Sequence, residues 1–221
     1  GQTRFDWLQS RHSFSFGEYR DPAHMGVSAL RVINDDVIDP GAGFEPHPHR
    51  DMEIISYVTR GAIVHRDSTG NDQQLGVGEV QLMSAGRGIV HSEYNASTSE
   101  ALHLLQIWIQ PRANGLTPCY QQQLFADLPG WQLLVSPDGE ADSLLIHQHA
   151  WLYRLRLAAD ETSERASVDG SLYYVHVIEG SLQLNGETLN AGDAITVTGE
   201  GLAIKAQQAS VALVFTLPEE S

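Results

Sequence analysis

The sequence contains a single cysteine, Cys119, among its 221 residues, and this scarcity excludes an internal disulfide framework and a thiolate metal cluster. It also lacks any run of about 18 apolar residues, the length that a membrane-spanning helix needs. The first residues carry no apolar stretch of the kind found in signal peptides. We therefore expect a soluble, cytoplasmic protein that makes no membrane contact.

Basic residues are scarce as well: 13 lysines and arginines stand against 28 aspartates and glutamates, which gives a formal net charge of -15. Proteins need Lys and Arg to neutralise nucleic-acid phosphates. This balance therefore argues against direct nucleic-acid binding. The 42% of hydrophobic residues is enough for a substantial buried core, so a folded chain of one or two domains is expected.

Long helical periodicity is nearly absent, and one short helix is expected over residues 121–128. Short runs of β-branched and aromatic residues recur instead, separated by Gly, Pro, Asn and Asp. The expected strands span residues 28–38, 54–59, 80–83, 101–110, 144–157, 172–178 and 211–217. This pattern predicts an all-β sandwich or barrel rather than alternating strands and helices.

Three histidines and a glutamate form two closely spaced pairs in the first half: His47 with His49, and His91 with Glu93. Alternate residues of a β-strand point to the same face, so the members of each pair share a face. Two facing strands would then bring four ligand atoms to one point, as a transition metal requires. The spacing predicts a mononuclear metal site at these four residues.

Two other histidine-containing segments receive a structural interpretation. His147 and His149 repeat the H-x-H spacing but have no matching partner pair, so we expect an ordinary strand pair near the surface. His103 lies in a strongly apolar strand, and we expect a satisfied core histidine there.

The two halves of the chain look like diverged copies of one unit. Residues 55–61 align with 174–180, and residues 75–80 align with 189–194. In this register the residues opposite the four predicted ligands are Ala166, Val168, Lys205 and Gln207. We expect an N-terminal domain with the metal site over 1–118, a linker over 119–130, and a degenerate C-terminal domain without metal ligands over 131–221.

The two ligand pairs resemble the motifs of the cupin superfamily. The first motif, G-x5-H-x-H-x3-E-x6-G, is met by Gly41, His47, His49, Glu53 and, after one extra residue, Gly61. The second, G-x5-P-x-G-x2-H-x3-N, is met by Gly78, Gly86, His91 and Asn95, with Ser84 replacing the proline and a longer interval before the histidine. Within the cupins, residues 12–16, 47–53 and 84–93 resemble the pirin family.

The pirin resemblance implies a bicupin, in which two antiparallel jelly-roll β-barrel domains pack together. It implies one metal per chain, held by the residues that match His47, His49, His91 and Glu93. Fe(II) is the expected metal, although such a ligand set also accepts Mn, Co, Ni, Cu or Zn.

The resemblance implies two functions of different classes. Bacterial pirins are similar to quercetin 2,3-dioxygenases, which cleave a flavonol with O2 and release carbon monoxide. Animal pirins are described as iron-dependent transcriptional coregulators. We expect a dioxygenase acting on quercetin or a related enolic aromatic. The alternative is a non-enzymatic iron-binding redox sensor that acts through a protein partner, and a cupin isomerase is a third option.

A flavonol dioxygenase needs a base to take the substrate proton. We expect Glu93 in this role, because a ligating carboxylate can turn a lone pair toward a bound hydroxyl. Glu53 is the second choice for the base, and it could instead orient a metal ligand. Phe44, Met83 and Trp108 could line an apolar cavity, although core packing is favoured for each. Because a bicupin covers its own domain faces, a monomer is expected.

Overall fold

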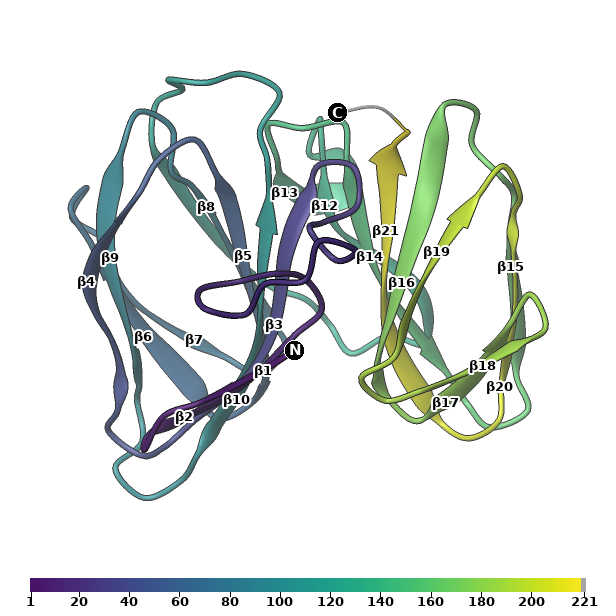
Figure 1. Ribbon diagram of the computed structural model, residues 1–221, viewed down its shortest axis with the longest axis horizontal. Helices are drawn as coiled ribbons and strands as arrows, with labels where there is room; N and C mark the ends of the chain where they lie inside the picture. The colour runs from purple at the N-terminus through teal and green to yellow at the C-terminus, as the bar shows by residue number, and fades with distance from the viewer. Residues whose placement is uncertain (220–221) are drawn as a thin grey trace. The chain divides into compact units, whose positions relative to one another are not determined.

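The computed structural model describes residues 1–219 and consists almost entirely of β-strands (Figure 1). The strands form four sheets, two in each of two compact units. The first unit comprises Gly1–Ala126 with Ile146–Gln148, and the second comprises residues 127–145 and the chain from His149 onward. The all-β prediction is confirmed. The described sheets are open, so each unit is a jelly-roll sandwich rather than a closed barrel.

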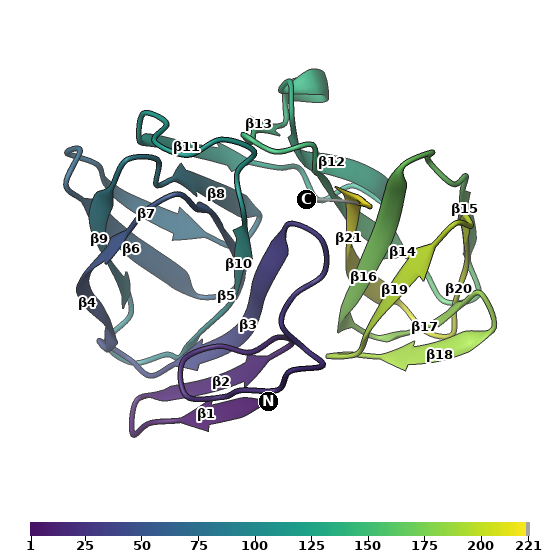
Figure 2. The same cartoon turned by 45° about the horizontal axis from the view of Figure 1, so that its top comes forward.

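The larger sheet of the first unit has seven antiparallel strands. In spatial order they are β1 (Gln2–Arg4), β2 (Leu8–His12), β3 (Leu30–Ile38), β10 (Leu102–Ile109), β5 (Glu53–Arg60), β8 (Glu79–Ser84) and β11 (Cys119–Leu124). Figure 2 shows β1 and β2 extending this sheet beyond β3. The N-terminal strands therefore lengthen the sheet wall.

The smaller sheet of the first unit faces the larger one across the core (Figures 1 and 2). Its order is β4 (Gly43–His49), β9 (Ile89–Asn95), β6 (Ala62–Asp67) and β7 (Asp72–Gly76). One cluster of buried residues draws on both sheets, namely Leu8, Ile38, Val58, Ile63, Leu75, Leu102 and Leu104. Burial of these aliphatic side chains holds the two sheets together.

The second unit has the same two-sheet plan. Its six-stranded sheet has the order β13 (Leu144–Leu145), β12 (Gly130–Ser136), β14 (Trp151–Leu157), β21 (Ser210–Pro218), β16 (Ser171–Glu179) and β19 (Ala194–Thr198). Its four-stranded sheet has the order β15 (Thr162–Arg165), β20 (Leu202–Ala206), β17 (Ser181–Leu184) and β18 (Glu187–Asn190). Both sheets contribute to one aliphatic core that includes Val175, Leu182 and Ile204.

Two local predictions were wrong. Residues 121–124, expected in a helix, belong to β11, because this segment pairs with the edge of β8. The only helical element among residues 1–219 is a short 3-10 turn, η1 (Glu140–Asp142). The strand expected over 144–157 is two strands, β13 and β14, and the bend between them contains His147 and His149.

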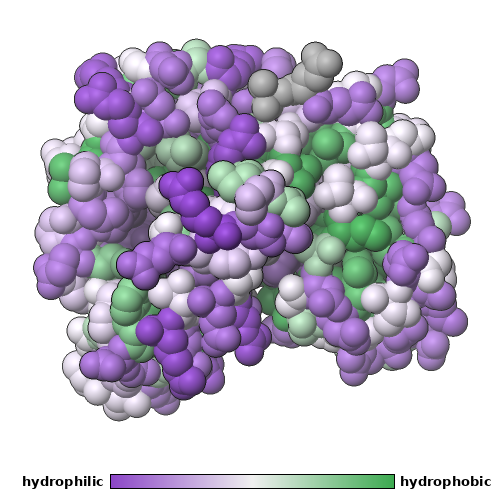
Figure 3. Space-filling model, in the orientation of Figure 1, coloured by the Kyte–Doolittle hydropathy of each residue, from purple (hydrophilic) through white to green (hydrophobic). Residues whose placement is uncertain are grey.

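The expected linker over 119–130 is also partly structured, because its first half is β11 of the first unit. The domain boundaries at 118 and 131 stay a prediction. On the face shown in Figure 3, hydrophilic side chains cover most of the first unit, and a hydrophobic area lies over β16 and β19 of the second. Within residues 1–219, no helix has the length and apolar character that a membrane span requires.

Candidate metal centre

The two predicted ligand pairs lie on adjacent strands of the smaller sheet. β4 and β9 are antiparallel neighbours, and His47 lies directly opposite His91 in their register. The expectation of two strands facing each other was therefore wrong in detail, because the strands lie side by side in one sheet. The side-chain period of two still brings both pairs to the inner face.

Three imidazole rings meet at this point. The ring centroids of His47, His49 and His91 lie 4.5 to 4.8 Å from one another, and one ligand atom from each lies within 4.8 Å of the others. The Nε2 atoms of His47 and His91 are 3.0 Å apart. Two ligands at right angles on one ion would be about 3 Å apart, given bonds of about 2.1 Å. The spacing suits a shared metal ion.

The hydrogen bonds of the first histidine fix its tautomer. Nδ1 of His47 lies 2.7 Å from the carbonyl oxygen of Glu45, so Nδ1 carries the proton and donates it. The lone pair of Nε2 then points toward the cluster. Metal-binding histidines are oriented in this way by a carbonyl acceptor on their second nitrogen.

Burial keeps the other two imidazoles neutral. Burial, together with repulsion from His91 and His47, lowers the pKa of His49 to about 4. Burial and repulsion from His47 and His65 together lower the pKa of His91 to about 3. A metal requires the unprotonated imidazole lone pair, so the donor set fits a divalent transition ion.

Glu93 is held by three polar side chains of the larger sheet. Gln106 Nε2 donates to Oε2 at 2.6 Å, while Ser56 Oγ at 3.2 Å and Gln81 Nε2 at 3.5 Å donate to Oε1. All four side chains are buried, and Glu93 is only 1% exposed. These donors satisfy a buried carboxylate and fix its direction.

An unpredicted histidine, His65, joins the site from β6. It forms a second group of possible ligands with His91 and Glu93, which again lie within 4.8 Å of one another. His65 Nε2 is 3.0 Å from Asp67 Oδ2, and both side chains are fully buried. The Nδ1 atoms of His65 and His91 are buried without a hydrogen-bond partner among residues 1–219. His91 thus belongs to both ligand groups.

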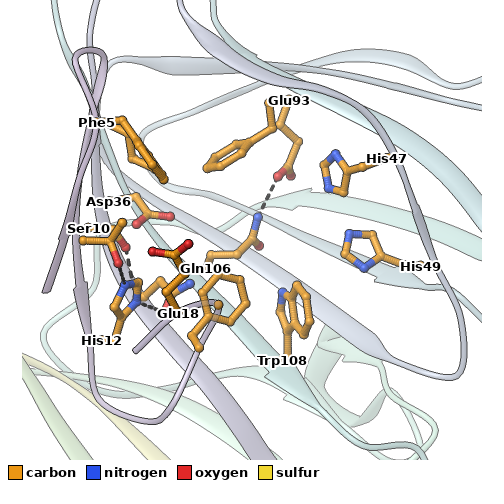
Figure 4. Close-up of a pocket in the computed structure, with 16 residues that line it drawn as sticks. Phe5, Ser10, His12, Glu18, Asp36, His47, His49, Glu93, Gln106 and Trp108 are labelled. Atoms are coloured by element: carbon orange, nitrogen blue, oxygen red, sulfur yellow. Dashed lines mark hydrogen bonds between the residues drawn. The ribbon is translucent and has the colours of Figure 1, made fainter. Parts of the chain in front are cut away.

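A cavity of about 360 Å³ opens beside the histidines, between the two sheets (Figure 4). Its volume lies within the range of small-molecule pockets, about 300 to 1,000 Å³. Phe5, Phe16, Phe44 and Trp108 supply aromatic walls, and the Trp108 ring meets the His49 ring edge to face at 4.9 Å. Phe44 and Trp108 therefore line the cavity, whereas Met83 does not and belongs to a buried cluster against which Trp108 also packs.

Glu53 lies apart from this constellation. β4 ends at His49 and β5 begins at Glu53, so the two residues do not share one unbroken strand. Its carboxylate accepts hydrogen bonds from Ser84 Oγ at 2.8 Å and from the backbone N–H of His147 at 3.3 Å. Burial raises its pKa. These bonds tie Glu53 to the segment around His147.

The prediction that His103 is a buried core residue was wrong. Its side chain is one-third exposed, and Nε2 lies 2.5 Å from Asp35 Oδ1. His147 is half-buried and His149 is exposed.

Family comparisons agree with this architecture. A family model described as Pirin matches residues 1–109, and one described as the quercetinase C-terminal cupin domain matches residues 133–217. The quercetin 2,3-dioxygenase of Escherichia coli (strain K12) is 48% identical over 219 residues, which cover 99% of this chain and 95% of that protein.

The chain belongs to the pirin family. A pirin-like protein of Caulobacter vibrioides is 41% identical over 89% of this chain and 86% of its own length. The crystal structure of the bacterial pirin YhhW from Escherichia coli in complex with nickel(II) matches this pirin with a TM-score of 0.96 and 47% identity. That match covers 99% of this chain and 95% of YhhW. A divalent metal therefore fits this pirin, as the donor set suggests.

Several residues of the site carried no signal in the sequence. His65, Gln106 and Asp36 come from three different strands and match no spacing motif, whereas His12 opens the segment 12–16 that resembles the pirin family. Only the alternation of β10, in which polar Gln106 interrupts an apolar run, could have pointed to an inward polar residue. This pirin thus builds its site from two motif strands and several isolated side chains.

Proposed function

We propose that this pirin is a metal-dependent dioxygenase that cleaves quercetin or a related flavonol with O2 and releases carbon monoxide. The observation that carries the proposal is the convergence of His47, His49 and His91 at the wall of an aromatic-lined cavity. Relatives named quercetin 2,3-dioxygenase, 48% identical over nearly the whole chain, support the same reaction class. A redox sensor would not need such a cavity, so the enzyme is the better-supported function.

The proposed ligands are His47, His49, His91 and Glu93, and Fe(II) is the proposed metal, with Mn, Co, Ni, Cu and Zn as alternatives. A bound divalent ion supplies Lewis acidity, which lowers the pKa of a chelated flavonol hydroxyl, and a centre for reaction with O2. The imidazoles of His49 and His91 are unprotonated at neutral pH, because burial lowers their pKa, so each can offer a lone pair to the ion.

Glu93 is the proposed base for the flavonol 3-hydroxyl. Gln106 donates to Oε2, which keeps a further lone pair that can receive the proton, while Ser56 and Gln81 both donate to Oε1. The hydroxyl proton would pass to Glu93 and leave the flavonolate in the pocket. The aromatic walls, including Phe44 and Trp108, would pack against the flat substrate and exclude water.

Oxygen uptake by anaerobically Fe(II)-loaded protein on addition of quercetin tests the function, together with detection of carbon monoxide. His91→Ala should abolish both signals. His149→Ala is the matched control, since this exposed histidine lies outside both ligand groups. No uptake by metal-filled wild-type protein would overturn the proposal and move the redox sensor ahead.

We also propose a cytoplasmic monomer whose partners are a flavonol-like substrate and O2, without direct nucleic-acid or membrane contact. The domains proposed for it are residues 1–118 and 131–221. Gel filtration with light scattering tests the monomer.

A further inference from the structure

The cavity has two polar ends separated by aromatic walls. His47 and His49 stand at one end, and Ser10, His12 and Asp36 stand at the other (Figure 4). Metal binding explains the polar residues at the first end of the cavity but not those at the second. A flat molecule chelated at the histidines would therefore extend its remote ring toward the second polar end.

Most polar groups at the second end already have partners. His12 Nδ1 lies 2.7 Å from Asn34 Oδ1, and His12 Nε2 lies 2.8 Å from Thr3 Oγ1. Ser10 Oγ lies 3.3 Å from the same His12 Nδ1. These bonds position the imidazole and use both of its nitrogens, so His12 has little capacity left for a ligand.

Asp36 differs because part of its hydrogen-bonding capacity is unused. It lies on β3 and is only 3% exposed. Ser10 is the hydrogen-bonding neighbour of its carboxyl group, but Oδ1 has no partner within residues 1–219. A buried polar atom without a partner costs about 1 to 3 kcal/mol. Because Asp36 lines the cavity, a hydroxyl group bound there is a candidate partner for its carboxyl group.

We infer that Asp36 is a hydroxyl-recognition residue that binds the ring of the substrate remote from the metal, and so selects flavonols hydroxylated at both ends over flavonols that carry only the metal-chelating pair. This inference rests on the proposed function and names the substrate class of that site. The ligand is thus a planar polyphenol with one chelating oxygen pair and at least one further hydroxyl beyond the aromatic walls.

The ionisation of Asp36 agrees with this role. Burial, together with repulsion from Asp35 and Glu93, raises the pKa of Asp36 to about 7, although the hydrogen bond from Ser10 acts to lower it. Near neutral pH the protonated carboxyl group can donate a hydrogen bond to a phenol, and the carboxylate can accept one from it. A phenolic hydroxyl can complement either form.

Anaerobic binding to Ni(II)-loaded protein tests the inference without turnover. The two probes are quercetin and 3-hydroxyflavone, which keeps the chelating hydroxyl and ketone but lacks every other hydroxyl. Chelation shifts the absorption of either flavonol, and this shift reports binding. We expect the wild type to prefer quercetin by about tenfold or more, the size of one unmade hydrogen bond to a buried group. Equal affinity for the two probes would overturn the inference without any variant.

Two variants and one control test whether Asp36 causes the preference for quercetin over 3-hydroxyflavone. Asp36→Leu should reduce the ratio of the two affinities toward one, while Asp36→Asn, which keeps a donor and an acceptor, should retain most of it. Asp35→Asn is the matched control, because this neighbouring carboxylate pairs with His103 instead of lining the cavity. A ratio unchanged in Asp36→Leu would also overturn the inference. If neither flavonol binds the metal-loaded wild type, the proposed function itself fails and the inference falls with it.

Discussion

His65 Nε2 lies 3.0 Å from Asp67 Oδ2 in a fully buried pair, and the His65 ring centroid lies 5.3 Å from that of His91 in the candidate metal centre. Burial works to raise the pKa of Asp67, but hydrogen bonds from His65, Thr69 and Asn71 outweigh it and lower the pKa below its usual value. The carboxylate therefore stays ionised and holds the proton of His65 on Nε2. The Nδ1 atom of His65, which has no hydrogen-bond partner within residues 1–219, then keeps its lone pair, and His65 belongs to one group of possible ligands with His91 and Glu93.

Asp67→Asn should weaken metal binding. The amide can present its N–H₂ group to His65 and reverse the imidazole tautomer, which removes the Nδ1 lone pair. His65 is a possible ligand through its group with His91 and Glu93, and loss of the carboxylate partner of a metal-binding histidine typically reduces metal affinity by about 10 to 100-fold. Competition with a chromophoric chelator for Ni(II) measures this affinity. Asp72→Asn, which alters an exposed ion pair with Arg66, is the control, and an equal effect in both variants would contradict the role of Asp67.

Metal loading should stabilise the first unit against unfolding. The ligands come from β4 and β9, so an ion bound by them joins two strands only in the folded state. At a free concentration 100 times the dissociation constant, the gain is about 2.7 kcal/mol. Thermal unfolding with Ni(II) and with a chelator measures it. His91→Ala should abolish the shift, and a shift of the same size in that variant would show that the ion binds elsewhere.

Gln106→Leu should slow turnover more than it weakens substrate binding. Gln106 donates to Glu93 Oε2 at 2.6 Å, and its loss leaves the proposed base poorly oriented. A hydrogen bond to a charged group contributes about 1.5 to 3 kcal/mol, so kcat should fall by about 10 to 100-fold. Steady-state oxygen uptake separates kcat from KM. Gln73→Leu on exposed β7 is the control, and a change confined to KM would argue against this role.

The protonation of Asp36 should make stability depend on pH. Its pKa is about 7 in the folded protein against 3.8 as the ordinary value, because burial disfavours the charged form. Between these pH values the folded state holds a proton that the unfolded state has lost, so stability falls as pH rises and levels off above about 7. Asp36→Asn removes this loss, which is roughly 4 kcal/mol at most.

Urea unfolding of wild type and Asp36→Asn at pH 5 and pH 8 measures the effect. The variant should gain stability relative to the wild type as the pH rises, and this double difference cancels contributions from other titrating groups. The charged groups that act on Asp36 are Asp35, Glu93 and His103, and they are unchanged in the variant. A difference that is constant with pH would mean that Asp36 is ionised throughout this range.

The fold class and the shared faces of the paired ligands could be predicted from the sequence because both depend on local periodicity. Strand periodicity is local, so His47 with His49 and His91 with Glu93 could be assigned to common faces from spacing alone. Pairing of β4 with β9 is a non-local property, and the sequence did not reveal whether these strands are neighbours or face each other. His65, Gln106 and Asp36 reach the site from strands that carry no motif. The segment 121–128 was misread because edge pairing with β8 outweighs its local pattern.

Gly43→Ala should disturb the metal centre from outside the ligand set. A Cβ atom at Gly43 would lie 2.3 Å from the carbonyl oxygen of Glu93 and 2.5 Å from Cα of Tyr94, so β4 would have to move away from β9. Backbone atoms cannot yield as a flexible side chain can, and overpacking of this kind costs about 1 to 3 kcal/mol. Since β4 carries two histidines and β9 carries the third, the same displacement should weaken Ni(II) binding.

Gly76→Ala is the control, because its nearest neighbour is the flexible Glu79 carboxylate at 3.5 Å. Urea unfolding and chelator competition on both variants measure the two effects. Loss of stability with unchanged metal affinity would show that the histidines keep their positions when β4 moves, and that the cluster is set by side-chain packing rather than by strand register.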